Sequence, residues 1–256
     1  MRIRLIVAIA SLSLVSISAV ALAAEPNAQQ PSVGDDVVFV EVDGVVAVEA
    51  EHFYKQTLND VRSWYRFSAD DRPEVEPDAD PPHLDDASGG AYVEILPDTR
   101  RNHGEKLIHG QNFINQPGKM ALLHYKVHFN TPGKYYVWAR IFSTGTEDNG
   151  MHVGIDGAWP ESGQRMQWTA KRKWAWGSKQ RTASQHGGEP FKLYLTIAEP
   201  GLHEIVFSMR EDGIEFDKWM MAREKKTTVD GHGPAARLKQ GSLPAAKLQT
   251  TDSEGR

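Results

Sequence analysis

The sequence contains no cysteine. This absence excludes a disulfide-stapled scaffold and an anchor attached through an N-terminal Cys, so stability must come from a packed core, with or without a metal. After the first 24 residues there is no further hydrophobic run long enough to span a bilayer. An excess of positive charge is also missing. The 29 basic and 34 acidic residues give a formal net charge of −5, which does not favour a nucleic acid as partner.

Residues 1–24 have the pattern of a secretory signal peptide. Arg2 and Arg4 precede an apolar run that ends in Ala21-Leu22-Ala23-Ala24, small residues that suit peptidase cleavage. The alternative is an uncleaved membrane anchor, since the run is nearly long enough to span a bilayer. Cleavage would make the protein secreted or periplasmic, with no membrane contact afterwards.

Short apolar runs bounded by Gly and Pro turns, such as Asp43-Gly44 and Asp156-Gly157, predict an all-β domain. Helical spacing occurs at 55–66, through Leu58, Val61 and Tyr65, and indicates one short helix there. About nine strands with long loop insertions predict a β-sandwich of the jelly-roll type over 37–223. The predicted strands are 37–42, 45–53, 91–96, 120–129, 135–142, 152–155, 191–197, 203–209 and 214–222.

Three segments are expected to lie outside the sandwich. Residues 25–36 are a polar lead-in that we expect to be flexible, and 224–256 have few large apolar groups, which predicts a disordered tail. Residues 69–86 are acidic and rich in proline, so we interpret them as a surface insertion.

Carboxylates recur on one face of the first and last predicted strands. In 45–53, Glu49 and Glu51 share the face opposite the apolar residues; in 214–222, strict alternation places Glu215, Asp217 and Trp219 together. If these strands are neighbours, Glu49, Glu51 and Asp217 could converge on one cation. Oxygen ligands and an exported protein favour Ca²⁺. The alternative is that all three acids simply face water.

Four ordered motifs resemble carbohydrate-binding modules of the family 6 and family 35 type. They are Val48-Glu49-Ala50-Glu51-His52-Phe53, Ser88-Gly89-Gly90-Ala91-Tyr92-Val93, Thr131 to Arg140 (TPGKYYVWAR) and Phe216-Asp217-Lys218-Trp219. The resemblance covers roughly 45–223 and implies a galactose-binding-like jelly roll. It also implies a structural calcium, on the acids that map to Glu49, Glu51 and Asp217.

The segment 159–177 is rich in tryptophan among Gly, Pro and charged residues, which is typical of a shallow glycan site, where sugar rings stack on indoles. The alternative is that these Trp residues plug the sandwich.

The resemblance implies that Trp174 is the loop aromatic and Tyr92 the opposing ring of a sugar clamp. Trp176 shares a strand face with Trp174. Glu215 stands where the family often has an Asn. Asn149 is a further polar candidate, with a turn-forming Asn-Gly as the alternative.

Catalytic motifs are missing: there is no His-Glu-x-x-His, no Gly-x-Ser-x-Gly and no pair of acids that spacing can assign to glycosidase chemistry. The sequence therefore predicts a non-catalytic module with no catalytic residue, which binds a polysaccharide or oligosaccharide, and a separate polysaccharide-degrading enzyme is a candidate partner. The alternatives are a small glycoside hydrolase, lyase or esterase on the same sandwich, or a protein-interaction domain.

Overall fold

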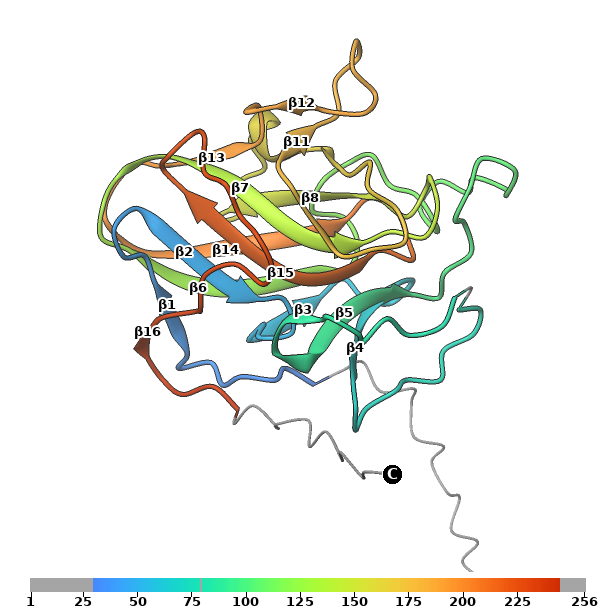
Figure 1. Cartoon of the computed structure of the whole chain (residues 1–256), viewed down its shortest axis with the longest axis horizontal. Coiled ribbons are helices and arrows are strands. Elements are labelled where there is room, and N and C mark those ends of the chain that lie inside the picture. Colours follow the sequence, from blue (N-terminus) through green and yellow to red (C-terminus); the bar gives the residue numbers. More distant parts are fainter. Residues whose placement is uncertain (1–29, 79, 245–256) are drawn as a thin grey trace, which may run out of the picture.

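The computed structural model describes residues 30–78 and 80–244, in which sixteen strands form two β-sheets that pack face to face (Figure 1). Two 3-10 turns, η1 (Ser88–Gly90) and η2 (Glu161–Gly163), accompany them. The predicted all-β jelly-roll sandwich is confirmed. The signal peptide predicted at 1–24 lies outside the described residues. Within 30–78 and 80–244, no helix has the length and apolarity needed to cross a membrane.

The first sheet has the order β12-β11-β9-β8-β14-β6-β1-β16, with β3 also paired to β6. Its longest contact is the antiparallel pairing of β6 with β14, over eight residue pairs. Its strands are β1 (Val38–Val40), β3 (Lys55–Thr57), β6 (Leu122–Phe129), β8 (Gly150–Ile155), β9 (Met166–Gln167), β11 (Lys179–Gln180), β12 (Glu189–Pro190), β14 (Gly201–Met209) and β16 (Leu238–Gln240).

The second sheet has the order β10-β7-β15-β5-β4, with β2 paired to β15 and β13 to β7. The strands at 45–53 and 214–222 are neighbours, as the shared cation site requires, because β2 and β15 pair antiparallel. The strands of this sheet are β2 (Val45–Glu49), β4 (Ser63–Ser68), β5 (Ala91–Leu96), β7 (Gly133–Phe142), β10 (Ala175–Gly177), β13 (Tyr194–Ile197) and β15 (Glu215–Ala222).

Two-residue turns behave as the sequence predicts. Asp43 and Gly44 have φ of 53° and 80°, and Asp156 and Gly157 have φ of 50° and 75°. Positive φ at both central positions is the geometry of a type I′ turn, which matches the twist of the flanking strands. The nine predicted strands all appear, and the additional strands are short segments of two to six residues.

The helix predicted at 55–66 is wrong, because this stretch forms β3 and enters β4. Leu58 and Val61, which suggested helical spacing, are 51% and 45% exposed, whereas Trp64 is fully buried. Pairing of β3 with β6 and of β4 with β5 overrides the local spacing.

A one-residue shift in β15 corrects the predicted face of Trp219. Phe216 lies opposite Ile141 of β7, but Lys218 lies opposite Arg140, so Asp217 is an extra residue, as in a β-bulge. The extra residue reverses the alternation. Phe216 and Trp219 both point into the core, and Trp219 is fully buried.

The described parts of the two terminal segments, 30–36 and 224–244, are more ordered than the sequence predicts. In the lead-in, Val33 is buried in the core. The expected disorder of 224–256 is wrong for the described part, since β16 pairs with β1 and Val229 packs on Trp176 and other residues of the second sheet. Residues 245–256 lie outside the described part of the chain.

Candidate functional site

Most of the predicted ligand-binding residues lie on the outer face, the side of the second sheet turned away from the core. On β5, Val93 and Ile95 belong to the core, so Tyr92 and Glu94 point outward. On β7, the same alternation turns Phe142 outward beside them. The segment 69–86, predicted as a surface insertion, covers this part of the outer face through the contacts described next.

Tyr92 and Trp174 meet as the family resemblance implies. Their ring centroids are 5.3 Å apart at an interplanar angle of 62°. Tyr92 is nevertheless fully buried, because its ring stacks on Phe67 at 5.1 Å, and its hydroxyl accepts a hydrogen bond from the His83 N–H at 3.1 Å. The Trp174 Nε1–H donates to the His83 carbonyl at 3.1 Å. These aromatics thus hold the insertion in place.

The His83 side chain occupies the recess between the insertion and the sheet. Its ring stacks on Phe142 with 3.7 Å between centroids and 17° between planes. Its Nδ1 lies 2.7 Å from Glu215 Oε1. The predicted ligand residue Glu215 therefore contacts the insertion and is only 2% exposed.

Burial changes the acid-base behaviour of this recess. It raises the pKa of Glu94 and of Glu215 well above the ordinary value, and neighbouring carboxyls raise both further. It lowers the pKa of His83, which keeps the imidazole neutral near pH 7. His83 therefore offers Glu215 a dipole and no positive charge.

Trp176 lies apart from Trp174 on the outer face. It packs with Trp138, Met220 and Val229, and its Nε1–H donates to the Gly231 carbonyl at 2.9 Å. The segment after β15 therefore contacts the indole.

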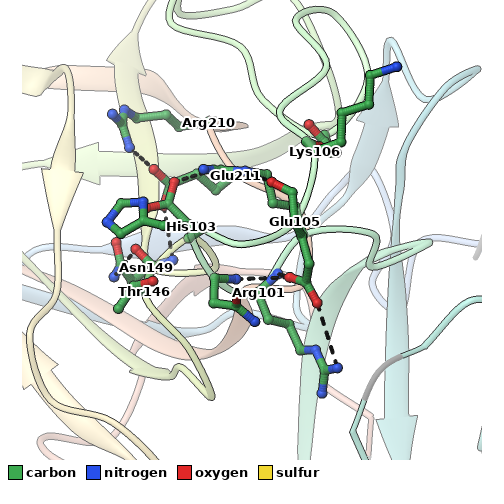
Figure 2. A network of polar contacts seen from close by, with 12 residues as sticks. Arg101, His103, Glu105, Lys106, Thr146, Asn149, Arg210 and Glu211 are labelled. Carbon is green, nitrogen blue, oxygen red and sulfur yellow. Dashed lines mark hydrogen bonds and ion pairs between the residues drawn. The ribbon is translucent and has the colours of Figure 1, made fainter.

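Asn149 belongs to a buried loop network (Figure 2). Its backbone N–H donates to Glu211 Oε2 at 3.0 Å, and its Nδ2–H donates to the Thr146 carbonyl at 2.9 Å. Its Oδ1 accepts a hydrogen bond from Gln167. Asn149 is 5% exposed, and its hydrogen bonds stabilise this loop.

Glu49 and Asp217 lie side by side, because Lys218 is opposite Glu49 and the Ala50 N–H donates to the Asp217 carbonyl at 2.9 Å. Cationic side chains contact both acids. Lys218 Nζ lies 2.6 Å from Glu49 Oε1, and Arg140 Nη1 lies 2.7 Å from Asp217 Oδ2.

Glu51 completes the predicted trio and is 4% exposed. Glu51 Oε2 and Glu49 Oε2 are both buried without a hydrogen-bond partner. Burial, and then the charge of Glu49, raises the pKa of Glu51. The two glutamates thus fit the oxygen donors that Ca²⁺ takes. Asp217 fits less well, because the Ser88 N–H and Arg140 already hold its two oxygens.

A hollow of about 520 Å³ opens between three loops near the insertion. Its lining includes three basic residues, Arg101, Lys171 and Arg172, together with the polar residues Asn102, Thr144 and Thr146.

The loops around this hollow, which we call the basic hollow, are tied together. The Arg172 N–H donates to the Ser143 carbonyl at 2.8 Å, and the Thr144 hydroxyl donates to Asp80 of the insertion. Gly145 allows the close approach, since a Cβ there would lie 1.9 Å from the Arg101 carbonyl oxygen. Lys171 and Arg172 are exposed.

The three basic residues were not among the predicted site residues. The signal for two of them was the run Lys171-Arg172-Lys173 beside the tryptophans. Arg101 lies in the long loop after β5. Sequence alone does not show that these two loops meet.

No family model matches the chain. The uncharacterized protein P23 of Formosa agariphila is 51% identical over 221 residues, which cover 86% of this chain and 54% of that protein. The chain therefore spans about half the length of this relative.

Solved structures of carbohydrate-active proteins are similar to the chain at low identity. A Paenibacillus xanthan lyase matches with a TM-score of 0.40 and 14% identity, over 70% of this chain and 13% of the lyase. A family 35 carbohydrate-binding module from Clostridium thermocellum matches with a TM-score of 0.37 and 14% identity, over 69% and 96% of the two chains. The C-terminal family 6 module of a marine laminarinase from Zobellia galactanivorans has a TM-score of 0.36 and 10% identity, over 70% and 99%.

Proposed function

We propose that this protein is a non-catalytic carbohydrate-binding module whose ligand is an acidic polysaccharide or oligosaccharide, bound at the basic hollow. The observation that carries the proposal is the composition of the lining. Arg101, Lys171 and Arg172 surround an open space of about 520 Å³, in a chain whose formal net charge is −5. Arg101 also pairs with Glu105 at 3.9 Å, so the exposed Lys171 and Arg172 carry most of the local positive charge. Local positive charge on an acidic protein attracts an anionic ligand.

The chemistry of the lining suits a glycan with carboxylate or sulfate groups. Guanidinium groups hold carboxylates and other oxyanions by paired hydrogen bonds, and Lys171 adds a point charge. Thr144 and Asn102 supply hydroxyl and amide groups for the neutral ring hydroxyls. Arg172 has a φ of 53°, a conformation that non-glycine residues adopt at some cost and that is often found at binding sites.

Contacts of Tyr92 and Trp174 with the insertion favour the basic hollow over these two rings as the place where a ligand binds. Tyr92 has no exposed face, and the Trp174 indole is bonded to the insertion. Both rings support the loop end of the sandwich, and the basic loops beside them are open to a ligand.

Export, calcium and a partner enzyme belong to the same proposal. The leader at 1–24 would direct the protein out of the cytoplasm, where a separate polysaccharide-degrading enzyme would act on the same glycan. The partnerless oxygens of Glu49 and Glu51 support a structural calcium. Since Lys218 Nζ lies 2.6 Å from Glu49 Oε1, calcium at these carboxyls requires that ammonium to move.

Affinity electrophoresis against neutral, uronic-acid and sulfated polysaccharides tests the proposal. We expect retention on acidic glycans that weakens with added salt, because exposed charges are screened. Lys171→Gln and Arg172→Gln should weaken retention, whereas the matched control Lys239→Gln, an exposed lysine on β16, should not.

Three results would contradict the proposal. Retention on no glycan is one, and retention on neutral glycans that the two variants leave unchanged is another. Release of soluble products from a polysaccharide by the purified chain is the third, and it would favour the enzyme alternative.

A further inference from the structure

The insertion and the second sheet together form a cluster of possible metal ligands that contains none of Glu49, Glu51 and Asp217. In one triad, ligand atoms of Asp80, His83 and Glu215 lie within 4.8 Å of one another. In a second triad, the same holds for Asp78, Asp80 and Glu94. Asp80 belongs to both triads and links them. Asp78, Asp80 and His83 come from the insertion, whereas Glu94 and Glu215 come from β5 and β15.

Two buried oxygens in this cluster lack any hydrogen-bond partner. Glu94 is 1% exposed and its Oε1 is unpartnered; Glu215 is 2% exposed and its Oε2 is unpartnered. A buried carboxylate oxygen without a partner is costly, so native proteins rarely retain one without an ion or a proton. These two unpartnered oxygens are an observation separate from the clustering, and they point to a cation as ligand.

The charges in the cluster are also unbalanced. Glu94 and Glu215 are directly opposite each other in the register of β5 and β15, and like charges in that position repel. Asp78 and Asp80 bring further negative charge to both glutamates. No Lys or Arg is ion-paired with either glutamate within 30–78 and 80–244.

We propose that the cluster of Asp78, Asp80, His83, Glu94 and Glu215 binds one divalent cation that fastens the insertion to the sheet. Four carboxylates and one imidazole form a mostly oxygen donor set with a single nitrogen. Carboxylates suit Mg²⁺, Ca²⁺ and Mn²⁺, and imidazole suits the transition metals, so Mn²⁺ satisfies both preferences. The His83 imidazole already lies within the cluster, since its Nδ1 is 2.7 Å from Glu215 Oε1.

The test is a titration of the chelator-treated, desalted protein with Mn²⁺, followed by the electron paramagnetic resonance signal of the free ion. We expect one Mn²⁺ bound per chain, with Zn²⁺ and Ca²⁺ as competitors that identify the preferred ion. Glu94→Gln and Glu215→Gln should each weaken binding by about tenfold or more. Asp85→Asn, an exposed acid in the same insertion, is the matched control and should bind as the unmodified protein does.

If a glutamate variant does not fold, another variant and another measurement test the same proposal. Asp80→Asn changes only a residue of the insertion and should also weaken binding. In the unmodified protein, Mn²⁺ should slow proteolysis within 69–86, because the ion would join the insertion to β5 and β15.

The proposal is overturned if the protein binds none of the three ions at millimolar concentration. It is also overturned if Glu51→Gln removes binding while Glu94→Gln and Asp80→Asn retain it, since the ion would then sit at the predicted calcium carboxyls. Neither result bears on glycan retention by the basic hollow, so failure here is distinguishable from failure of the proposed function.

Discussion

Glu94 of β5 and Glu215 of β15 lie directly opposite each other on adjacent antiparallel strands, and neither residue is more than 2% exposed. Two ionised carboxylates cannot share such a place without a proton or a cation between them. The stability of the sandwich around Glu94 and Glu215 therefore depends on pH and on divalent ions.

The first prediction concerns pH. The folded-state pKa of Glu94 and of Glu215 is raised above the ordinary 4.5. Their contribution to stability is therefore fully present below pH 4.5 and is lost as pH rises towards the folded pKa. With cations chelated, the free energy of unfolding should fall as pH rises from 5 to 8, by about 1.4 kcal/mol per pH unit for each group that titrates.

A matched variant isolates this effect from other buried acids, such as Asp98, whose pKa burial raises to about 8. Glu94→Gln removes one titrating group, so its unfolding free energy, measured with urea, should fall less steeply with pH. Equal slopes in the variant and the unmodified protein would show that the pair does not titrate in this range.

The second prediction concerns Lys218→Met. The Lys218 and Glu49 side chains are only 3% and 14% exposed, so loss of the ammonium leaves a mostly buried carboxylate without its counter-charge. The expected cost is about 3–5 kcal/mol of unfolding free energy in the presence of a chelator.

Added Ca²⁺ should restore more stability to Lys218→Met than it adds to the unmodified protein, because the ammonium no longer competes for Glu49. The measurement is the melting temperature with and without Ca²⁺. Identical shifts in both proteins would contradict calcium binding at Glu49 and Glu51.

The third prediction concerns Trp174→Phe. This change keeps an aromatic ring and removes the Nε1–H that donates to the His83 carbonyl. We expect a loss of about 1 kcal/mol in stability and faster proteolysis within 69–86. Trp176→Phe is the matched control, since its indole N–H holds Gly231 and not the insertion.

Glycan retention separates two roles for Trp174. In the proposal above, its ring supports the insertion and the ligand lies in the basic hollow, so Trp174→Phe should bind acidic glycans with unchanged affinity. A large drop in affinity with unchanged melting would assign the indole to the ligand.

Short apolar runs bounded by turns predicted the nine main strands, whereas the pairing of β2 with β15 was only a condition for the cation site and is known from the structure. Turns such as Asp43-Gly44 were predictable because only a few residue types accept positive φ at two successive positions. The face of Trp219 was predicted incorrectly, since nothing in the alternation of 214–222 marks Asp217 as an extra residue.

The candidate site was less predictable than the fold. Tyr92 and Trp174 do meet, but the sequence does not show that 69–86 folds back over them. That arrangement depends on contacts between residues far apart in the chain, such as His83 with Glu215. The basic hollow was missed for the same reason, because Arg101 and Arg172 are brought together only by tertiary structure.

The extra residue at Asp217 separates two parts of β15 that make different contacts. Upstream of it, Glu215 faces the insertion; downstream, Lys218 reaches Glu49 while Trp219 enters the core. Deleting Asp217 would leave Phe216 and Trp219 facing the core in a regular strand, but it would remove the carboxylate that the Ser88 N–H and Arg140 hold. The bulge is therefore required by the contacts of the Asp217 carboxylate, and the packing of the core would tolerate its loss.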